Sequence, residues 1–428
     1  MRTYQETLDY INHLPRLVKR PDHERVLRLL AQLGDPHKKG RYIHITGTNG
    51  KGSTASMLSH ILSASALRVG LFTSPFIMRF NERLMVDNQP IADDELVLAA
   101  DVVITAVQTL QAEDADYQLT AFDFETVMAF WYFDHIDVDV AVFEVGIGGR
   151  DDSTNVMTPL VSVITEVALD HQKMLGDTLA EIAGHKAGII KQGVPVVLGP
   201  LPDEAQTVVI TQAQQLDAPV WQYDQQFATQ MLAPIAWGQM FNYRGELGQL
   251  KDLAIPLVGD YQVVNASLAI TAALLYQQLT KWPIKPREIR QGLAESSWPG
   301  RFEKISDEPL IILDGAHNPD GIAHLVTTLK TRFSGTNPQI IAGVLADKAM
   351  APMIAALQQV GTVTLVPVPD TPRSATLADY DTLGNTQPSW QEALAMVLEA
   401  DTDQPIIVTG SLYLVAAVRQ TLLGGSDD

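Results

Sequence analysis

The sequence contains no cysteine. It can therefore form no disulfide and offers no thiolate, so any bound metal must use oxygen or imidazole ligands, which points toward magnesium. Long apolar segments are also missing. There is no uncharged apolar run near about eighteen residues, and no basic segment followed by an apolar one at the start. These absences predict a cytoplasmic protein without a membrane segment.

Basic residues are scarce. The chain has 30 Lys and Arg against 50 Asp and Glu, a formal charge of −20. A broad nucleic-acid surface needs clustered cations, so none is predicted. An anionic substrate would have to be held by local Lys or Arg side chains, because the net negative charge of the protein repels it. The 428 residues and 46% hydrophobic content are typical of a globular protein of about two or three domains.

A glycine-rich loop follows the first predicted strand. The apolar alternation Tyr42–Ile45 predicts that strand, and after it come Gly47-Thr48-Asn49-Gly50-Lys51-Gly52-Ser53 and a helix over Gly52–Ala66. The glycines let successive N–H groups face a phosphate chain, Lys51 supplies a charge, and Ser53 offers a hydroxyl. The spacing departs from the usual nucleotide loop, so a plain strand-to-helix turn is the alternative.

Polar side chains stand at the ends of three further strands. Strand Val69–Phe72 leads to Ser74, strand Val138–Phe143 to Glu144, and strand Leu160–Glu166 to His171. Ligands bind at the carboxyl ends of strands in open α/β sheets. Each residue alone has an ordinary structural explanation, but together they favour a shared Mg²⁺ site.

The loop after Ser74 carries rings and cations. Phe76 and Phe80 alternate there with Arg79 and Arg83, a combination that suits an aromatic, anionic ligand. A surface loop with an aromatic anchor is the alternative.

Lys186 lies in a helix predicted over Thr178–Ile190, beside apolar neighbours. Partial burial would lower its pKa, and the neutral amine could act as a nucleophile or take up CO₂ as a carbamate. Periodicity alone favours an ordinary lysine on an amphipathic face.

The remaining pattern predicts two α/β domains. Residues 1–296 are predicted to form a P-loop-type parallel-sheet ATPase domain with a small antiparallel flap at about 224–256. Residues 297–300 are a linker, and residues 301–428 form a smaller doubly wound, Rossmann-like domain.

Further helices of the first domain are predicted at 4–13, 22–33, 93–111, 120–135, 203–216, 259–279 and 286–295, and strands at 195–198 and 220–222. The second domain alternates strands at 309–313, 339–344, 363–366 and 405–408 with helices near 320–332, 350–359, 389–399 and 411–422. The last residues, 426–428, are expected to be a frayed tail.

Taken together, the motifs resemble those of the folylpolyglutamate and dihydrofolate synthases of the Mur ligase superfamily. The similar stretches, in family order, are Gly47–Ser53, Val142–Asn155, Leu169–His171, His185–Lys191, Pro299–Glu303 and Asp314–Pro319. Together with the strand before the first stretch, the motifs span about residues 41 to 321. In this family Lys186 corresponds to the carbamylated lysine, an assignment that rests on the resemblance.

The resemblance implies an ATP-dependent amide ligase that joins L-glutamate to the γ-carboxylate of a folate through an acyl phosphate. The implied ATP-binding residues are Thr48, Asn49, Gly50, Lys51, Gly52, Ser53, Asn265, Arg301 and Asp314. Two Mg²⁺ ions would be held by Ser74, Glu144, His171 and the carbamate, formed from CO₂, on Lys186. Folate would contact Phe76, Arg83 and Asp152, glutamate would contact His317 and Ser411, and Lys186, His317 and Asp314 would be catalytic. The substrates are small molecules, and a monomer is expected.

The sequence departs from the family pattern at two positions, and the first of them bears on specificity for the pterin side of the substrate. Phe76 stands where many relatives have histidine, and Ser153 replaces a commoner alanine. The nearest alternative is a dihydrofolate synthase, alone or as a second activity. A peptidoglycan-precursor Mur ligase is a more distant one, and a nucleotide-gated binding protein is the alternative outside the ligases.

Overall fold

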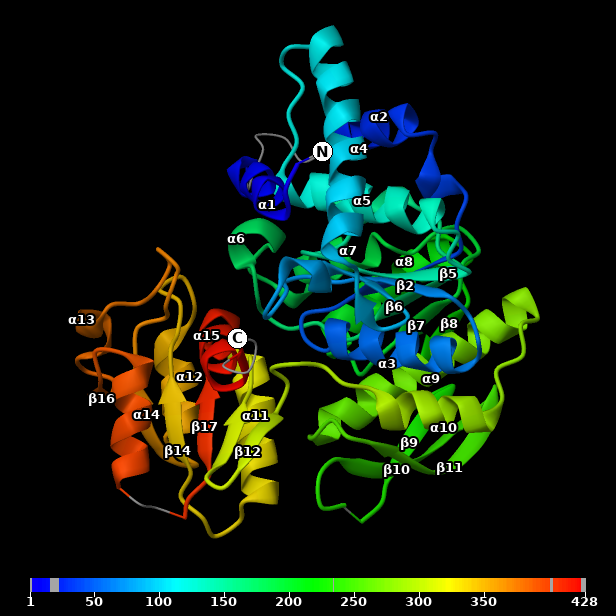
Figure 1. The fold of residues 1–428 in the computed structure, drawn as a ribbon. Coiled ribbons are helices and arrows are strands. Elements are labelled where there is room, and N and C mark those ends of the chain that lie inside the picture. Colours follow the sequence, from blue (N-terminus) through cyan, green and yellow to red (C-terminus); the bar gives the residue numbers. More distant parts are fainter. Residues whose placement is uncertain (1, 16–22, 234, 401–402, 425–428) are drawn as a thin grey trace. The chain divides into compact units, whose positions relative to one another are not determined.

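The computed structural model describes residues 2–15, 23–233, 235–400 and 403–424 (Figure 1). Residue 22, where the second helix is predicted to begin, and the expected tail at 426–428 lie outside these residues. The chain divides into two compact units. The first comprises residues 1–233, 240–256 and 262–297, and the second comprises 234–239, 257–261 and 298–428. The main division after Ser297 falls in the region where a linker is predicted, whereas the two short segments of the second unit were not foreseen.

The first unit contains an eight-stranded sheet in the order β4-β3-β2-β5-β1-β6-β7-β8. The strands are β1 Tyr42–Thr46, β2 Val69–Phe72, β3 Leu84–Val86, β4 Gln89–Pro90, β5 Val140–Glu144, β6 Val161–Ile164, β7 Val196–Leu198 and β8 Val220–Gln222. β4 is the edge strand and pairs antiparallel with β3, which in turn pairs antiparallel with β2. Neither β3 nor β4 was predicted, because a strand of two or three residues is too short to show a recognisable alternation of apolar and polar residues.

The block β2-β5-β1-β6 of this sheet is parallel throughout. β1, from which the glycine-rich loop departs, lies between β5 and β6, and every residue of these four strands is buried. A parallel strand covered on both faces is an apolar run, as found here. The loops that follow these neighbouring strands therefore leave the sheet at one edge.

The helices of the first unit agree with prediction to within a few residues, except for the short α6, which was not predicted. They are α1 Tyr4–His13, α2 Glu24–Gln32, α3 Lys51–Ala64, α4 Asp93–Glu113, α5 Ala121–His135, α6 Gln172–Leu175, α7 Leu179–Ala187, α8 Asp203–Gln215, α9 Asp260–Thr280 and α10 Pro286–Glu295. Among the described residues, α4 alone is long and apolar enough to cross a membrane, and half of its apolar stretch is buried. Its apolar residues, including Leu96, Val103 and Val107, belong to the main core, where they pack with residues of α2 and α5. Packing in the core accounts for its composition.

A small sheet occupies the stretch where a flap is predicted. It contains β9 Phe227–Met231, β10 Gln239–Gly245 and β11 Gly248–Ile255, in the order β11-β10-β9. β9 and β10 are antiparallel.

The second unit is a six-stranded sheet in the order β12-β13-β17-β14-β15-β16, with β12 antiparallel to β13. The strands are β12 Glu303–Asp307, β13 Leu310–Leu313, β14 Gln339–Ala342, β15 Thr362–Leu365, β16 Asn385–Thr386 and β17 Ile406–Thr409. The helices are α11 Pro319–Arg332, α12 Met350–Leu357, α13 Leu377–Tyr380, α14 Trp390–Glu399 and α15 Leu412–Leu423. Helices cover both faces of the sheet (Figure 1).

Alternation along the strands of the second unit supplies its two cores. Ile312, Ile340 and Ile407 belong to one buried cluster, whereas their neighbours Ile311 and Ile341 belong to another. Successive strand residues point to opposite faces, so each face receives an apolar layer. The doubly wound arrangement confirms the predicted α/β fold class.

Candidate functional site

The glycine-rich loop connects β1 to α3, which begins at Lys51. Gly50 precedes the helix with φ +83°, in the left-handed region, so glycine suits this position. The Lys51 ammonium donates to the carbonyl oxygens of Gly47 at 2.9 Å and Thr48 at 3.2 Å. Ser53 is buried in the first turn of α3. The first N–H groups of a helix have no partner within the helix, so this end of α3 suits a phosphate.

Side chains and backbone after β6 hold the glycine-rich loop in place. The Thr165 hydroxyl donates to the Asn49 carbonyl at 2.6 Å, and the Thr48 N–H donates to the Glu166 carbonyl at 2.9 Å. A Cβ atom on Gly47 would lie 1.8 Å from Oγ1 of Thr165, so only glycine fits there. Sequence reasoning missed the role of Thr165, because contacts between two loops leave no periodic pattern.

Asn265, predicted to contact the nucleotide, lies against the same loop. Its Oδ1 would be 2.5 Å from a Cβ atom on Gly50. The Asn265 amide donates to Oε1 of Gln262 at 2.9 Å within α9. A helix far along the chain is thus in contact with the glycine-rich loop.

Ser74 and Glu144, two predicted metal ligands, are hydrogen-bonded neighbours. The Ser74 N–H donates to Oε2 of Glu144 at 3.2 Å, and Glu144 is 4% exposed. They follow β2 and β5, which are adjacent. The carboxylate of Glu144 and the hydroxyl that the neighbouring Ser74 carries are hard oxygen donors of the kind that Mg²⁺ prefers.

Lys186, near the end of α7, is 2% exposed. Burial holds its pKa well below the usual value for lysine; the nearby Lys51 charge lowers it further, while Asp170 and Glu166 act in the opposite direction. Lys186 is therefore within electrostatic reach of the glycine-rich loop. This environment favours the neutral amine.

His171 differs from the other predicted ligands because its side chain is 40% exposed. It adopts φ +51° just before α6, and its Nε2 lies 4.0 Å from Oδ2 of Asp170. It follows β6, next in the sheet to β1.

Phe76 and Arg83, predicted to contact folate, lie together in the loop after Ser74. The rings of Phe76 and Phe80 are 5.9 Å apart, and the Arg83 guanidinium carbon lies 5.3 Å and 5.5 Å from their centroids. The Glu82 carboxylate organises the loop because it accepts hydrogen bonds from the N–H groups of residues 77–79. Glu82 was missed, since a carboxylate that accepts only backbone N–H groups has no sequence signature beyond its loop position.

Asp152, also predicted to contact folate, has a structural part in its own loop. Its carboxylate accepts from the Ile147 N–H at 3.0 Å, the Thr154 N–H at 3.1 Å and the Thr154 hydroxyl at 2.6 Å. Burial raises its pKa, and these hydrogen bonds oppose the rise. Its observed contacts therefore fix the shape of residues 146–155.

The second unit brings its predicted residues to the neighbouring strands β13 and β17. Asp314 accepts from the N–H groups of Phe302 at 3.0 Å and Ala316 at 2.9 Å. Burial raises the pKa of Asp314, and the charge of Arg301 opposes this. Nδ1 of His317 lies 2.8 Å from the carbonyl oxygen of Gly315.

Ser411 stands before α15 as its N-cap. It is buried, and its hydroxyl accepts from the Tyr413 N–H at 3.2 Å. The loops after β13 and β17 are joined directly, because the Gly410 N–H donates to the Ala316 carbonyl at 3.1 Å. The predicted residues of the second unit thus lie in two connected loops.

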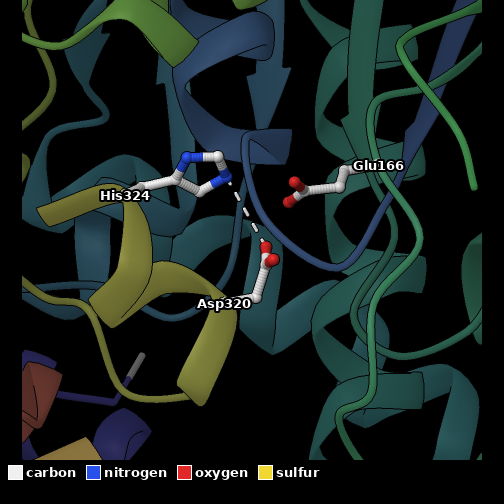
Figure 2. A group of neighbouring side chains, drawn as sticks. All are labelled: Glu166, Asp320 and His324. Carbon is white, nitrogen blue, oxygen red and sulfur yellow. Dashed lines mark ion pairs between the residues drawn. The ribbon is translucent and has the colours of Figure 1, made fainter. Parts of the chain in front are cut away.

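Two titratable residues of α11 were not predicted. Figure 2 shows Asp320 and His324 one helical turn apart, with an ion-pair separation of 3.5 Å. The ring of Tyr261 lies 5.0 Å from the ring of His324. A carboxylate and an imidazole at this spacing occur often on exposed helices, so the sequence offered no signal for them.

Comparisons with known proteins cover nearly the whole chain. Residues 45–273 match the Mur ligase middle domain, and residues 300–412 match the Mur ligase, glutamate ligase domain. The folylpolyglutamate synthase of Lacticaseibacillus casei is 55% identical over 425 residues, which cover 99% of this chain and 99% of that protein. The dihydrofolate synthase/folylpolyglutamate synthase of Bacillus subtilis (strain 168) is 35% identical over 427 residues, 98% of this chain and 99% of that protein. A solved FPGS complex with AMPPCP and folate superimposes with a TM-score of 0.92 and 53% identity, covering 99% of this chain and 100% of that one.

Proposed function

The chain belongs to the folylpolyglutamate synthase family of Mur ligases, and we propose that it joins L-glutamate to the γ-carboxylate of a folate through an acyl phosphate. The observation that carries this is the convergence at one sheet edge. The glycine-rich loop, Glu144 and the segment reaching His171 follow the adjacent strands β1, β5 and β6, and the buried Lys186 is within electrostatic reach of the loop. These groups can bind a nucleoside triphosphate and neutralise its charge.

The chemistry needs activation of a carboxylate. A γ-carboxylate oxygen attacks the terminal phosphorus of ATP, the bond to the β-phosphate oxygen breaks, and ADP leaves. The amine of glutamate then attacks the acyl carbon, phosphate departs, and the amine loses a proton. Phosphoryl transfer requires positioning and charge neutralisation more than covalent help from the protein.

We assign the phosphates to the glycine-rich loop. Lys51 would exchange its contacts with the loop carbonyls for the β- and γ-phosphates, and the N–H groups at the start of α3 would face the same oxygens. Asn265, which lies on α9, is also assigned to ATP binding. Among residues of the second unit, Arg301 and Asp314 are assigned to the nucleotide, and His317 and Ser411 to the incoming glutamate.

We assign two Mg²⁺ ions to the oxygen and imidazole donors. Ser74 and Glu144 suit one ion, and Glu144, His171 and a carbamate on Lys186 suit the other. The neutral Lys186 amine would attack CO₂: a nitrogen–carbon bond forms, one carbon–oxygen π bond opens to an oxyanion, and the nitrogen loses a proton, so a neutral amine becomes an anionic oxygen donor. When bound, the ions would supply charge neutralisation for the phosphate oxygens.

The folate side is assigned to Phe76 and Arg83, with Asp152 shaping the adjoining loop. The Bacillus subtilis relative is named for both dihydrofolate synthase and folylpolyglutamate synthase activity, so a dihydropteroate substrate is the second candidate. A cytoplasmic location and a monomeric state stay predictions.

A substrate panel tests the proposal. The protein would be incubated with ATP, Mg²⁺ and labelled glutamate, together with tetrahydrofolate, methylenetetrahydrofolate or dihydropteroate, and the products would be sized. We expect glutamate incorporation into the reduced folates and ATP consumption that requires both co-substrates. ATP hydrolysis indifferent to folate and glutamate would overturn the ligase assignment, and incorporation into dihydropteroate would establish the second activity.

A further inference from the structure

Glu125 is a buried acid in the second turn of α5, and it faces the end of the loop between Ser74 and Arg83. Its side chain is 5% exposed, and its Oε2 lies 3.2 Å from Nη1 of Arg83, whose side chain is 15% exposed. Isolated buried carboxylates are rare because ionisation in an apolar environment is unfavourable. A charged partner therefore gives Glu125 a reason to be there.

Arg83 is held by charge and rings instead of by directional hydrogen bonds. Its guanidinium lies over both Phe76 and Phe80. Nε of Arg83 is buried and donates no hydrogen bond to the residues that the structure describes, and Nη1 faces Oε2 of Glu125 at 3.2 Å without the geometry of a hydrogen bond. Buried donors without acceptors are unfavourable in the absence of a ligand. Acceptor atoms of a bound molecule would satisfy them.

The other charged side chains of this loop, Arg79 and Glu82, have partners other than Arg83. Arg79 pairs with Asp93 at 2.7 Å at the surface, where their side chains are 59% and 48% exposed. Glu82 accepts from backbone N–H groups of its own loop. Glu125 is thus the acid that balances Arg83. Burial raises the pKa of Glu125 to about 7, and the charge of Arg83 opposes the rise.

We propose that Glu125 is a positioning residue for the folate substrate. Its carboxylate pairs with Nη1 and holds the Arg83 guanidinium against Phe76 and Phe80, so that the Nε–H group, which has no acceptor among the described residues, meets an acceptor atom of the aromatic substrate. This proposal rests on the proposed function, which places folate at Phe76 and Arg83. Without the Glu125 charge, Arg83 would be a buried cation without a counter-ion and would move toward water.

The test compares Glu125→Gln with Asp93→Asn. Glu125→Gln keeps the shape of the side chain and removes its charge, whereas Asp93→Asn removes the charge that faces the other arginine of the loop. For Glu125→Gln we expect the KM for tetrahydrofolate to rise about tenfold or more, with kcat at saturating folate and the KM for ATP within about twofold. Asp93→Asn should leave all three within about twofold, because exposed ion pairs contribute little.

Three outcomes would overturn the role of Glu125. The first is an unchanged folate KM in a folded Glu125→Gln protein. The second is an equal rise in the KM values for folate and ATP with a lowered melting temperature, which indicates general structural damage. The third comes from a double-mutant cycle: if the effects of Glu125→Gln and Arg83→Gln on folate binding add, the two residues do not act together.

Failure of the ligase proposal and failure of the role of Glu125 would be seen in different measurements. If the unaltered protein incorporates no glutamate, the ligase proposal fails. Equilibrium binding of tetrahydrofolate to the unaltered protein, Arg83→Gln, Glu125→Gln and the double variant still decides the role of Glu125. Should Glu125→Gln fail to fold, Glu125→Asp and Arg83→Gln carry the test, with weaker folate binding expected for both and unchanged binding contradicting it.

Discussion

Oδ1 of Asn265 lies 2.5 Å from the position that a Cβ atom on Gly50 would occupy. Gly50 also has φ +83°, a conformation that costs other residues about 1–2 kcal/mol. Two separate constraints, one on the backbone and one from a neighbour, therefore favour glycine at the last position before α3. The contact ties α9 to the glycine-rich loop.

Replacement of Gly50 by alanine is expected to displace Asn265 and weaken ATP binding. We predict a rise of about tenfold in the KM for ATP and a modest loss of stability, measured by steady-state kinetics and chemical denaturation. Gly193→Ala is the matched control, because Gly193 has φ +67° but no neighbour within 4 Å of its Cβ position. It should lose similar stability with an unchanged KM. Equal KM values for the two variants would show that the contact with Asn265 is unimportant.

Lys186→Met is expected to lower turnover in the presence of CO₂ and, in CO₂-free buffer where Lys186 is an unmodified amine, to be more stable than the unaltered protein. Burial depresses the pKa of Lys186, so between the folded-state pKa and the ordinary value near about 10.4 the unfolded chain binds a proton that the folded chain lacks. Stability therefore rises with pH across this window, and methionine removes that slope. Denaturation at about pH 7 and pH 9 measures it, and a variant less stable than the unaltered protein at neutral pH would contradict the burial argument.

The carbamate on Lys186 has its own test. Labelled bicarbonate should give a carbamate carbon signal in the unaltered protein that is missing from Lys186→Met. Turnover in Lys186→Met should fall by about 10² or more, as for loss of a group that stabilises transition-state charge. Acetate or formate should restore part of the activity of Lys186→Ala, because it can supply the missing carboxylate. Full activity without CO₂ would argue against the modification.

The sequence predicted the α/β fold because alternation, glycine and capping residues act locally. The strand-to-helix passage at Gly50 and the strand end at Glu144 were therefore recognisable. The adjacency of β2, β5, β1 and β6 was not, since it depends on pairing between distant segments. For the same reason, periodicity alone indicates that Lys186 is an ordinary helical lysine. The role of Glu125 depends on its contact with Arg83, which is distant in the sequence and leaves no local pattern.

Arg301→Ala is expected to preserve the fold and to lower kcat/KM by about 10²-fold, the typical cost of one lost charge-stabilising group. Loss of the guanidinium should also raise the pKa of Asp314 further, because Arg301 now opposes the effect of burial. Arg419→Ala is the control. Arg419 pairs with Glu303 at 3.0 Å on the same unit and should leave the kinetics unchanged. Unaltered kinetics in Arg301→Ala would remove this residue from the site.

Ser411 allows its capping role to be separated from the proposed contact with glutamate. Loss of an N-cap hydroxyl costs about 0.5–2 kcal/mol on replacement by alanine but only a few tenths on replacement by glycine. Stability should therefore fall more in Ser411→Ala than in Ser411→Gly. The KM for glutamate should rise in both if the hydroxyl binds the substrate. A KM that follows stability alone would assign Ser411 to capping the helix.

The pKa of Glu125, raised to about 7 by burial, predicts a dependence of stability on pH. At pH values between the ordinary glutamate pKa of about 4.3 and the folded-state pKa of about 7, Glu125 of the folded chain keeps a proton that the unfolded chain has released. The contribution of Glu125 to stability therefore falls as pH rises through this window. Glu125→Gln should remove this slope in denaturation experiments from about pH 5 to pH 8.

Folate binding should show the opposite dependence on pH. As Glu125 loses its proton, the ion pair with Arg83 strengthens and the guanidinium is held in place. The KM for tetrahydrofolate should therefore fall as the pH rises from about 6 to 8, relative to that of Glu125→Gln, measured with saturating ATP and glutamate. Comparison of the two proteins at each pH cancels the titration of the substrates and of other groups. Parallel profiles would show that Glu125 does not control the position of Arg83.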